Sequence, residues 1–244
     1  MAGASSERQE KGLMNAINDA IKANKGNAVT VVFDNMTLSG VTKAKKFSGR
    51  QAGGSEPYTD IQLFIKNRSK PINLSCKGES APSLAGGGLK GLELAVPGIA
   101  KKFMLKAFEH LKTKKKLRIG DKVPDVYGKI SKQNKLKIVV GNEAMGGPIH
   151  YMYIGPMDVT KQPYDSAKNR LKISGSMYEA ESYADSKELY FRLRARRDDQ
   201  RFDPTAKDSM GTPKIYGKSP SKGDSAGRIV VTDSTPASAV TVNL

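Results

Sequence analysis

Two short apolar segments joined by a tight turn constrain the fold of this chain more than any other feature. Residues 60–66 read Asp-Ile-Gln-Leu-Phe-Ile-Lys, residues 72–77 read Ile-Asn-Leu-Ser-Cys-Lys, and Asn-Arg-Ser-Lys-Pro separates them. Apolar and β-branched residues favour strands, whereas Asn, Ser and Pro favour a short turn. The two segments therefore predict a β-hairpin on which the rest of the domain has to pack.

Two amphipathic patterns predict helices on either side of this hairpin. Between residues 6 and 24 the apolar positions recur at three- and four-residue spacing, which gives one apolar stripe made of Leu13, Met14, Ile17, Ala20 and Ile21. Pro97 suits the first turn of a second helix. That helix has a stripe made of Ile99, Phe103, Ala107, Phe108 and Leu111. Both helices are expected to cover a sheet.

Further apolar runs predict more strands. They lie at residues 29–33, 136–140, 149–154, 171–174, 189–196 and 228–232, whereas residues 40–57 read as an exposed loop or a ragged hairpin. The expected fold is α/β of the mixed α+β kind, with a central mixed sheet flanked by helices. Residues 1–200 are expected to form this basic domain. Residues 201–244, rich in Gly, Ser, Pro and Lys, are expected to form an extended arm with one short strand.

The charge of the chain favours a polyanionic partner. It has 41 Lys and Arg against 24 Asp and Glu, a formal net charge of +17, and such an excess is typical of nucleic-acid-binding proteins. No apolar run is long enough to span a membrane, and the N-terminus lacks the apolar core of a signal peptide. Cys76 is the only cysteine, which excludes a disulfide framework and a multi-cysteine zinc site. Any bound metal is expected to be Mg²⁺ held by carboxylates.

Two basic segments are candidate phosphate contacts. Side chains alternate between faces along a strand, so Arg192, Arg194 and Arg196 share one face of the predicted strand at 189–196. Their alternative roles are a solvated sheet face or ion pairs with acids such as Glu179 and Glu181. Lys114, Lys115 and Lys116 follow the second predicted helix, where they either contact nucleic acid or solvate the helix end.

Asp60 and Lys77, one on each strand of the hairpin, have the residue types of a nuclease site. Phosphodiester hydrolysis uses carboxylates to hold Mg²⁺ and a lysine to orient water or offset developing charge. Residues 6–115, with Pro57-Tyr-Thr-Asp60 and Ser75-Cys-Lys77, resemble the PD-(D/E)XK restriction-endonuclease-like superfamily. The resemblance implies Asp60 as metal ligand and Lys77 as catalytic residue.

This chain departs from the family motif at two places. Two residues separate Pro57 from Asp60, and Ser75 stands where the family has a metal-binding acid. Either Glu79, on the same strand face if the strand continues, or Glu10 in the first predicted helix would have to supply the second carboxylate. The alternative is that Asp60 caps a strand start and Lys77 is an ordinary exposed residue.

A second resemblance concerns the whole chain. Residues 74–88, residues 190–199 and the Gly/Ser-rich tail look like proteins of large contractile-tailed bacteriophages. The resemblance implies a structural component of the virion, assembled in the host cytoplasm, in the head, neck or tail. Its expected partners are other virion subunits in an oligomer, with DNA as a further one. The alternatives are a Mg²⁺-dependent phage endonuclease and a non-catalytic DNA-binding protein that acts alone; only the endonuclease requires a cofactor.

Overall fold

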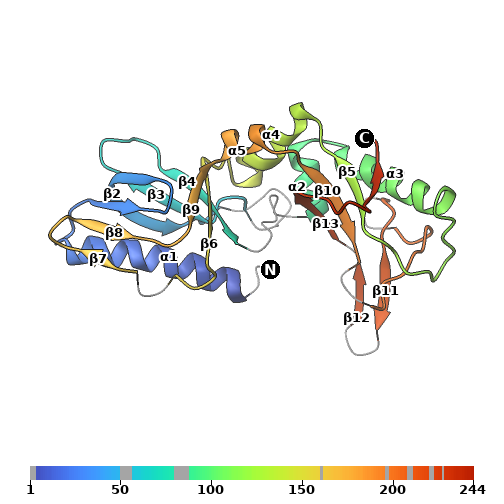
Figure 1. Ribbon diagram of the computed structural model, residues 1–244, viewed down its shortest axis with the longest axis horizontal. Helices are drawn as coiled ribbons and strands as arrows, with labels where there is room; N and C mark the ends of the chain where they lie inside the picture. The colour runs from blue at the N-terminus through green and yellow to red at the C-terminus, as the bar shows by residue number, and fades with distance from the viewer. Residues whose placement is uncertain are drawn as a thin grey trace. The chain divides into compact units, whose positions relative to one another are not determined.

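The computed structural model describes residues 4–49, 57–79, 88–159, 162–195, 198–207, 211–219, 223–226 and 228–244. The chain divides into two compact units (Figure 1). Unit 1 contains residues 1–82 and 139–184, and unit 2 contains residues 83–138 and 185–244. Each unit combines a sheet with helices, so the mixed α+β class is confirmed.

Unit 1 is built on an eight-stranded mixed sheet. In the order β7-β8-β1-β2-β3-β4-β6-β9 the strands are Tyr164–Asp165, Arg170–Lys172, Val29–Val32, Thr37–Lys46, Ile61–Ile65, Ile72–Gly78, Tyr151–Gly155 and Ser176–Glu179. β3 and β4 pair antiparallel, which confirms the predicted hairpin. β6 lies parallel to β4 on its other side.

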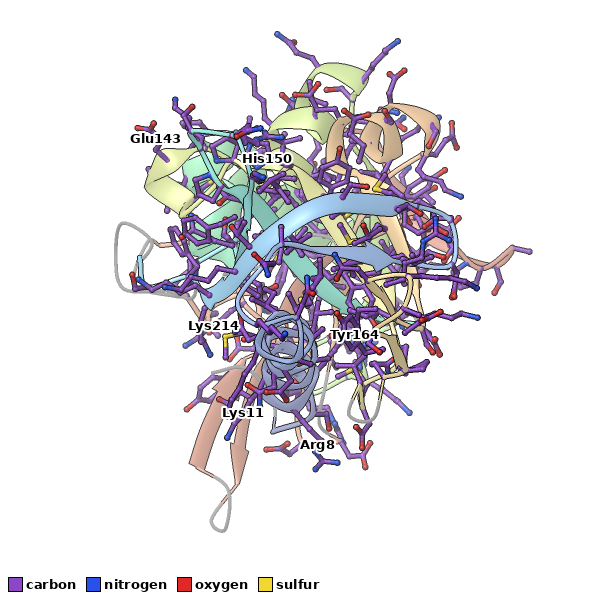
Figure 2. All side chains as sticks on the ribbon, turned by 90° about the vertical axis from the view of Figure 1, so that its left-hand side faces the viewer. Arg8, Lys11, Glu143, His150, Tyr164 and Lys214 are labelled. Carbon is purple, nitrogen blue, oxygen red and sulfur yellow. The ribbon has the colours of Figure 1, made fainter. Side chains whose placement is uncertain are left out.

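One face of this sheet is covered by α1, Ala4–Ala23. Leu13 and Ile17 of α1 are fully buried, as are Leu63 and Leu74 of the sheet, and each such side chain contributes about 2 kcal/mol of hydrophobic stabilisation. Figure 2 looks along α1 and shows the strands arching over it. Successive side chains along a strand point to opposite faces of the sheet. The side chains that lie between the core residues of these strands therefore face away from α1.

Unit 2 has a four-stranded sheet and a two-stranded ribbon. The sheet order is β13-β10-β5-β14, with strands Arg228–Thr232, Tyr190–Arg194, Val126–Lys129 and Val240–Val242. β11, Tyr216–Ser219, and β12, Gly223–Ala226, form the ribbon. Its helices α2 and α3 span Gly88–Ala95 and Ile99–Thr113. The rings of Phe103 and Phe191, 5.3 Å apart, join α3 to β10.

The remaining helices include one segment that the sequence predicts to be a strand. Residues 136–140 belong to α4, Lys132–Val140, so the strand prediction there is wrong. A short apolar run does not distinguish a strand from a buried helix segment. The helix buries Ile138 and Val139 and places Lys135 so that its Nζ donates to the carbonyls of Asp185 and Lys187, at 2.7 and 2.8 Å. η1, Glu143–Met145, and α5, Ala180–Ser186, complete the set.

Two other segments also differ from expectation. The loop or ragged hairpin expected at 40–57 is, over its first part, the ten-residue strand β2. Its apolar signal is weak because only Val41 and Ala44 are buried. In residues 201–244, β13 pairs with β10 and β14 pairs with β5. The boundary expected at residue 200 therefore does not coincide with the division into compact units.

Candidate functional site

Asp60 lies directly before β3, against the middle of β4. Its Oδ2 accepts hydrogen bonds from the backbone N–H of Cys76, at 2.6 Å, and from the hydroxyl of Ser75, at 3.2 Å. Its own N–H donates to the carbonyl of Leu74, at 2.8 Å. Burial raises the pKa of the Asp60 carboxyl, and Lys77, these two hydrogen bonds and Lys46 oppose that rise. The carboxyl therefore joins the two strands of the hairpin.

The structure brings Ser75 and Lys77 to Asp60, as the hairpin predicts. Ser75 is 3% exposed and uses its hydroxyl as a donor to Asp60. The nuclease family has a second acid at the position of Ser75. In this chain the serine at that position donates a hydrogen bond to Asp60. Glu79 lies exposed in the turn after β4, and no hydrogen bond joins it to Asp60 in the described part of the chain.

Glu10 approaches the same region from α1. It is 8% exposed, and its Oε2 lies 3.3 Å from Nζ of Lys46 on β2. Burial raises the pKa of the Cys76 thiol well above its usual value, and the negative charges of Asp60 and Glu10 add to this effect. Among the residues that the structure describes, no three His, Cys, Asp or Glu side chains are arranged to hold a metal ion.

Two buried hydroxyls beside Asp60 were not anticipated from the sequence. Tyr58 and Thr59 are 4% and 0% exposed, and neither hydroxyl has a hydrogen-bond partner within the described residues. Their backbone N–H groups donate to the carbonyls of Met145 and Gly146. In the sequence they are only the two residues that separate Pro57 from Asp60, and nothing in the pattern indicates that their hydroxyls are buried.

The predicted arginine row of unit 2 is partly neutralised. Arg192 Nε donates to Oδ2 of Asp125 at 2.8 Å, and the guanidinium lies 5.7 Å from the centre of the Tyr127 ring. The alternative of pairing with an acid therefore holds for Arg192, although the acid is Asp125 and neither Glu179 nor Glu181. Arg194 is half-buried. Arg196 lies outside the described residues.

The lysine run after α3 is exposed to solvent. The backbone N–H groups of Lys114 and Lys115 donate to the carbonyl of His110 and so close the end of the helix. Around them the exposed cations are Lys112, Lys114, Lys115, Lys116, Arg118 and Lys122. No ion pair involves any of them in the part of unit 2 that the structure describes. We call these six residues the unit 2 basic loop.

A second group of cations lies on the side of the unit 1 sheet away from α1, over the strands β8, β1, β2 and β3, and we call this part of the sheet the open face. Lys43 is directly opposite Phe64, and Lys45 is directly opposite Gln62, on β2 and β3. The open face also carries Arg170 and Lys172 of β8, beside Thr30 and Val32 of β1. These four cations are exposed and form no ion pair with a described carboxylate. The sequence alone does not reveal this surface, because its residues come from strands far apart in the chain.

An acid lies at the edge of the open face. Asp165 of β7 is directly opposite Arg170. Its Oδ2 lies 3.8 Å from Nζ of Lys168, which forms an exposed ion pair. The open face therefore keeps a clear positive excess.

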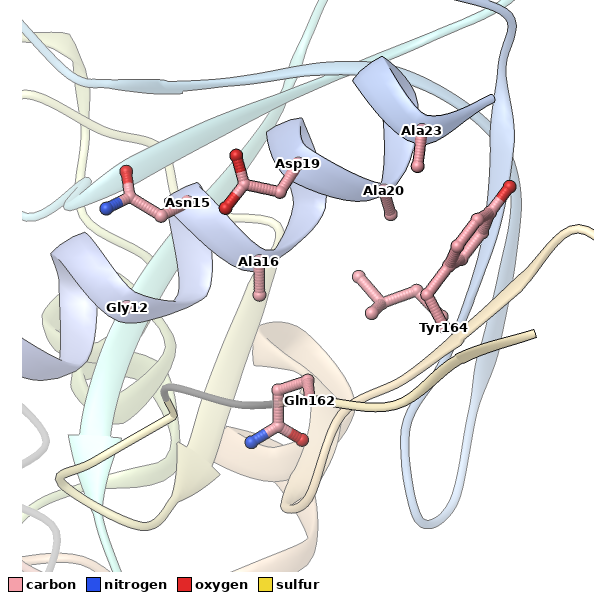
Figure 3. A pocket seen from close by; sticks show the side chains of 9 residues that line it. Gly12, Asn15, Ala16, Asp19, Ala20, Ala23, Gln162 and Tyr164 are labelled. Atoms are coloured by element: carbon pink, nitrogen blue, oxygen red, sulfur yellow. The ribbon is translucent and has the colours of Figure 1, made fainter. Parts of the chain in front are cut away.

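A groove between α1 and β7 is separate from these residues. Its volume is about 440 Å³, and its wall includes Gly12, Asn15, Ala16, Asp19, Gln162 and Tyr164 (Figure 3). The α1 side of the wall is formed largely by small side chains. None of the site residues predicted from the sequence lines this groove.

Comparisons with known proteins add no assignment to this geometry. No protein-family model, no curated protein and no solved structure matches the chain. In the described part of the chain, every helix is too short or too polar to cross a membrane.

Proposed function

We propose that this chain is a non-catalytic nucleic-acid-binding protein that uses the open face of unit 1 as its main contact surface. The observation that carries the proposal is a set of four cations on this face that form no ion pair with a carboxylate among the described residues: Lys43, Lys45, Arg170 and Lys172. A cation that forms no ion pair within the protein can bind a phosphate without first breaking a contact. Binding then gains free energy, because a counterion condensed on the nucleic acid is released. The net charge of +17 favours the same partner.

The spacing of the lysines also supports a phosphate-binding role. Lys43 and Lys45 are two residues apart on one strand, which corresponds to about 6.6 Å along β2. That spacing is comparable to the distance between successive phosphates of an extended strand. The unit 2 basic loop offers a second positive surface, so binding need not depend on unit 1 alone.

The proposal is tested by measuring binding of a labelled oligonucleotide as a function of salt concentration. The Lys43→Ala/Lys45→Ala variant is expected to lower affinity and to reduce the slope of log K against log salt by about 0.7 for each lost contact. Arg8→Ala/Lys11→Ala is the matched control. These two exposed cations lie on the side of α1 away from the sheet (Figure 2), and their removal changes the net charge by the same amount.

The two double variants distinguish binding by the open face from attraction by the net charge of the chain. Equal loss of affinity in both would show that only net charge matters and would reject the open face as the contact surface. Absence of binding by the unaltered chain at low salt would reject the proposed function itself.

We place this binding protein in a tailed-phage particle, as a structural component assembled from many subunits. The support is the resemblance of residues 74–88 and 190–199 to phage proteins, together with the basic surfaces of both units. Sedimentation of the purified chain, with and without DNA, tests the placement. A defined oligomer is expected, and a monomer under both conditions would favour a protein that acts alone.

A Mg²⁺-dependent endonuclease is the second candidate, and the proximity of Asp60, Ser75 and Lys77 is the observation that favours it. Against it, Asp60 is occupied by two donors and Ser75 provides no charge for a metal. Incubation of supercoiled plasmid with the protein and Mg²⁺ distinguishes the two functions. We expect no nicking; Mg²⁺-dependent nicking that Asp60→Ala abolishes would establish the endonuclease.

A further inference from the structure

The shape of the open face limits which form of nucleic acid can meet it. The four strands from β8 to β3 lie about 4.8 Å apart, so the face is about 15 Å across, which exceeds the ~12 Å width of the DNA major groove. The strands arch over α1, so the face turned away from α1 is convex (Figure 2). A broad convex sheet cannot enter a groove of duplex DNA, but the bases of a single strand can lie flat on it.

An aromatic ring lies among the cations of this face. Leu63 belongs to the core of unit 1 and Ile65 packs against that core, so the intervening Phe64 points to the opposite side of the sheet. Phe64 is half-buried and directly opposite Lys43. A ring beside a lysine can stack on a base while the lysine contacts a neighbouring phosphate.

Polar groups continue the surface next to the ring. Gln62, two residues before Phe64, is directly opposite Lys45, and its Nε2 donates to Oδ1 of Asn73 at 3.0 Å. A row containing Lys45, Gln62 and Asn73 therefore lies beside a row containing Lys43 and Phe64. The hydrogen bond holds the two amides in place at the level of the sheet, where the edges of unpaired bases would lie.

We infer that the open face binds single-stranded nucleic acid in preference to duplex, with Phe64 as a stacking residue and Lys43 and Lys45 as phosphate contacts. The inference rests on the proposed function and specifies single strands as the form of nucleic acid that is bound. It does not require sequence preference, because every base offers a π-face to an aromatic ring. DNA and RNA share this chemistry.

The test compares binding of a mixed-sequence oligonucleotide, as DNA and as RNA, with binding of the same DNA annealed to its complement. Fluorescence anisotropy at fixed salt is expected to show tighter binding of the single strands. Phe64→Ala is expected to weaken single-strand binding about tenfold and to leave duplex binding unchanged. Phe64→Leu keeps the apolar volume but lacks a π-face, so it should weaken binding as Phe64→Ala does, whereas Phe64→Tyr should bind like the unaltered chain.

The outcomes separate this inference from the proposed function. Failure to bind any oligonucleotide rejects both. Equal affinity for single strand and duplex, unaffected by Phe64→Ala, rejects the inference and leaves the proposed function intact. If Phe64→Leu binds as well as the unaltered chain, the ring serves packing and the stacking role is rejected; thermal unfolding of each variant confirms that it is folded.

Discussion

The carboxylate of Asp60 accepts a 2.6 Å hydrogen bond from the backbone N–H of Cys76. The contact crosses from the residue before β3 to the middle of β4, next to the regular backbone ladder of the hairpin. It offsets part of the cost that burial imposes on the charge of this carboxylate. The side chain therefore links the two strands of the hairpin.

Replacing Asp60 is expected to show this structural role. Asp60→Ala leaves the Ser75 hydroxyl and the Cys76 N–H without their acceptor, and unpaired buried donors cost about 1–3 kcal/mol each. Asp60→Asn keeps an acceptor oxygen and should lose less. Urea unfolding of the three proteins measures the difference, and equal stability of all three would contradict the role.

The difference in unfolding free energy between the unaltered chain and Asp60→Asn is expected to depend on pH. The pKa of Asp60 is raised in the folded state above its ordinary value of 3.8, so the folded protein binds the proton more tightly than the unfolded chain. The contribution of Asp60 is therefore complete below about pH 4 and falls as pH rises through the folded-state pKa. The unfolding free energy of the unaltered chain, minus that of Asp60→Asn, should decrease with rising pH; an increase would contradict the direction of the shift.

Cys76 is expected to react slowly as a thiol. Burial and the nearby carboxylates of Asp60 and Glu10 raise its pKa well above the usual value, and the thiolate is the reactive form. At about pH 8, a disulfide reagent such as DTNB should modify the folded chain at least about tenfold more slowly than the urea-unfolded chain. Asp60→Asn should accelerate the folded reaction modestly, since burial is the larger cause. Equal rates in folded and unfolded protein would show that the thiol is accessible.

His150 is expected to cause a loss of stability in mild acid. Its Nδ1 accepts a 2.9 Å hydrogen bond from the N–H of Asn73, so the neutral ring is the bonded form. Burial lowers the pKa of His150, Arg68 adds to the effect, and Glu181 opposes it. The contribution is present above the ordinary pKa of 6.5 and is lost as pH falls toward the folded-state value.

His150→Asn provides the control for this prediction, because its side-chain oxygen can replace Nδ1 as acceptor but does not titrate. Unfolding curves at about pH 7.5 and about pH 5.5 should show a smaller loss of stability for the variant. An identical loss would assign the acid sensitivity to another group.

Arg192 and Arg194 are expected to behave differently although they share one strand face. Arg192→Ala breaks the contact with Asp125 and should cost about 1 kcal/mol with little effect on oligonucleotide binding. Arg194→Ala should leave stability within about 0.5 kcal/mol. Asp125→Ala is the matched control for the first effect. Equal loss of stability in both arginine variants would contradict the assignment of Arg192 to Asp125.

Gly175 is expected to be intolerant of alanine. Its φ is +113°, and a Cβ there would lie 2.8 Å from Cα of Gly155 and 2.9 Å from the carbonyl oxygen of Ile154. Gly26 also has a positive φ, +82°, but a Cβ there meets nothing within 4 Å. Gly26→Ala should therefore cost about 1 kcal/mol from backbone strain alone, and Gly175→Ala at least about 2 kcal/mol. Similar thermal unfolding of the two variants would contradict the close contact.

The sequence is a good guide where local pattern and tertiary packing agree. The periodic stripe containing Leu13 and Ile17 predicts α1, and the paired apolar runs around Asn67 predict the β3–β4 hairpin. The predicted hairpin also implies that Asp60 lies near Ser75 and Lys77, as it does in the structure. In these segments the side chains that make the pattern are the ones that become buried.

Prediction fails where the signal is short or depends on distant partners. The apolar run at 136–140 fits a strand or a helix equally well, and contacts of Lys135 with carbonyls near residue 186 accompany the helix. β2 has a weak apolar pattern because one of its sides faces solvent. The acid that pairs with Arg192 comes from a segment 67 residues away, which strand periodicity cannot reveal.

By itself, the sequence determined the strong positive charge, the presence of α1, α3 and the central hairpin, and the lack of a second acid at Ser75. Only the tertiary structure decided which cations pair and which stay free. It joins Arg192 to Asp125 and leaves Lys43, Lys45, Arg170 and Lys172 together on one sheet face. The physical reason is that charge is a sum over the chain, whereas a binding surface depends on strand order and register, which bring residues from distant segments side by side.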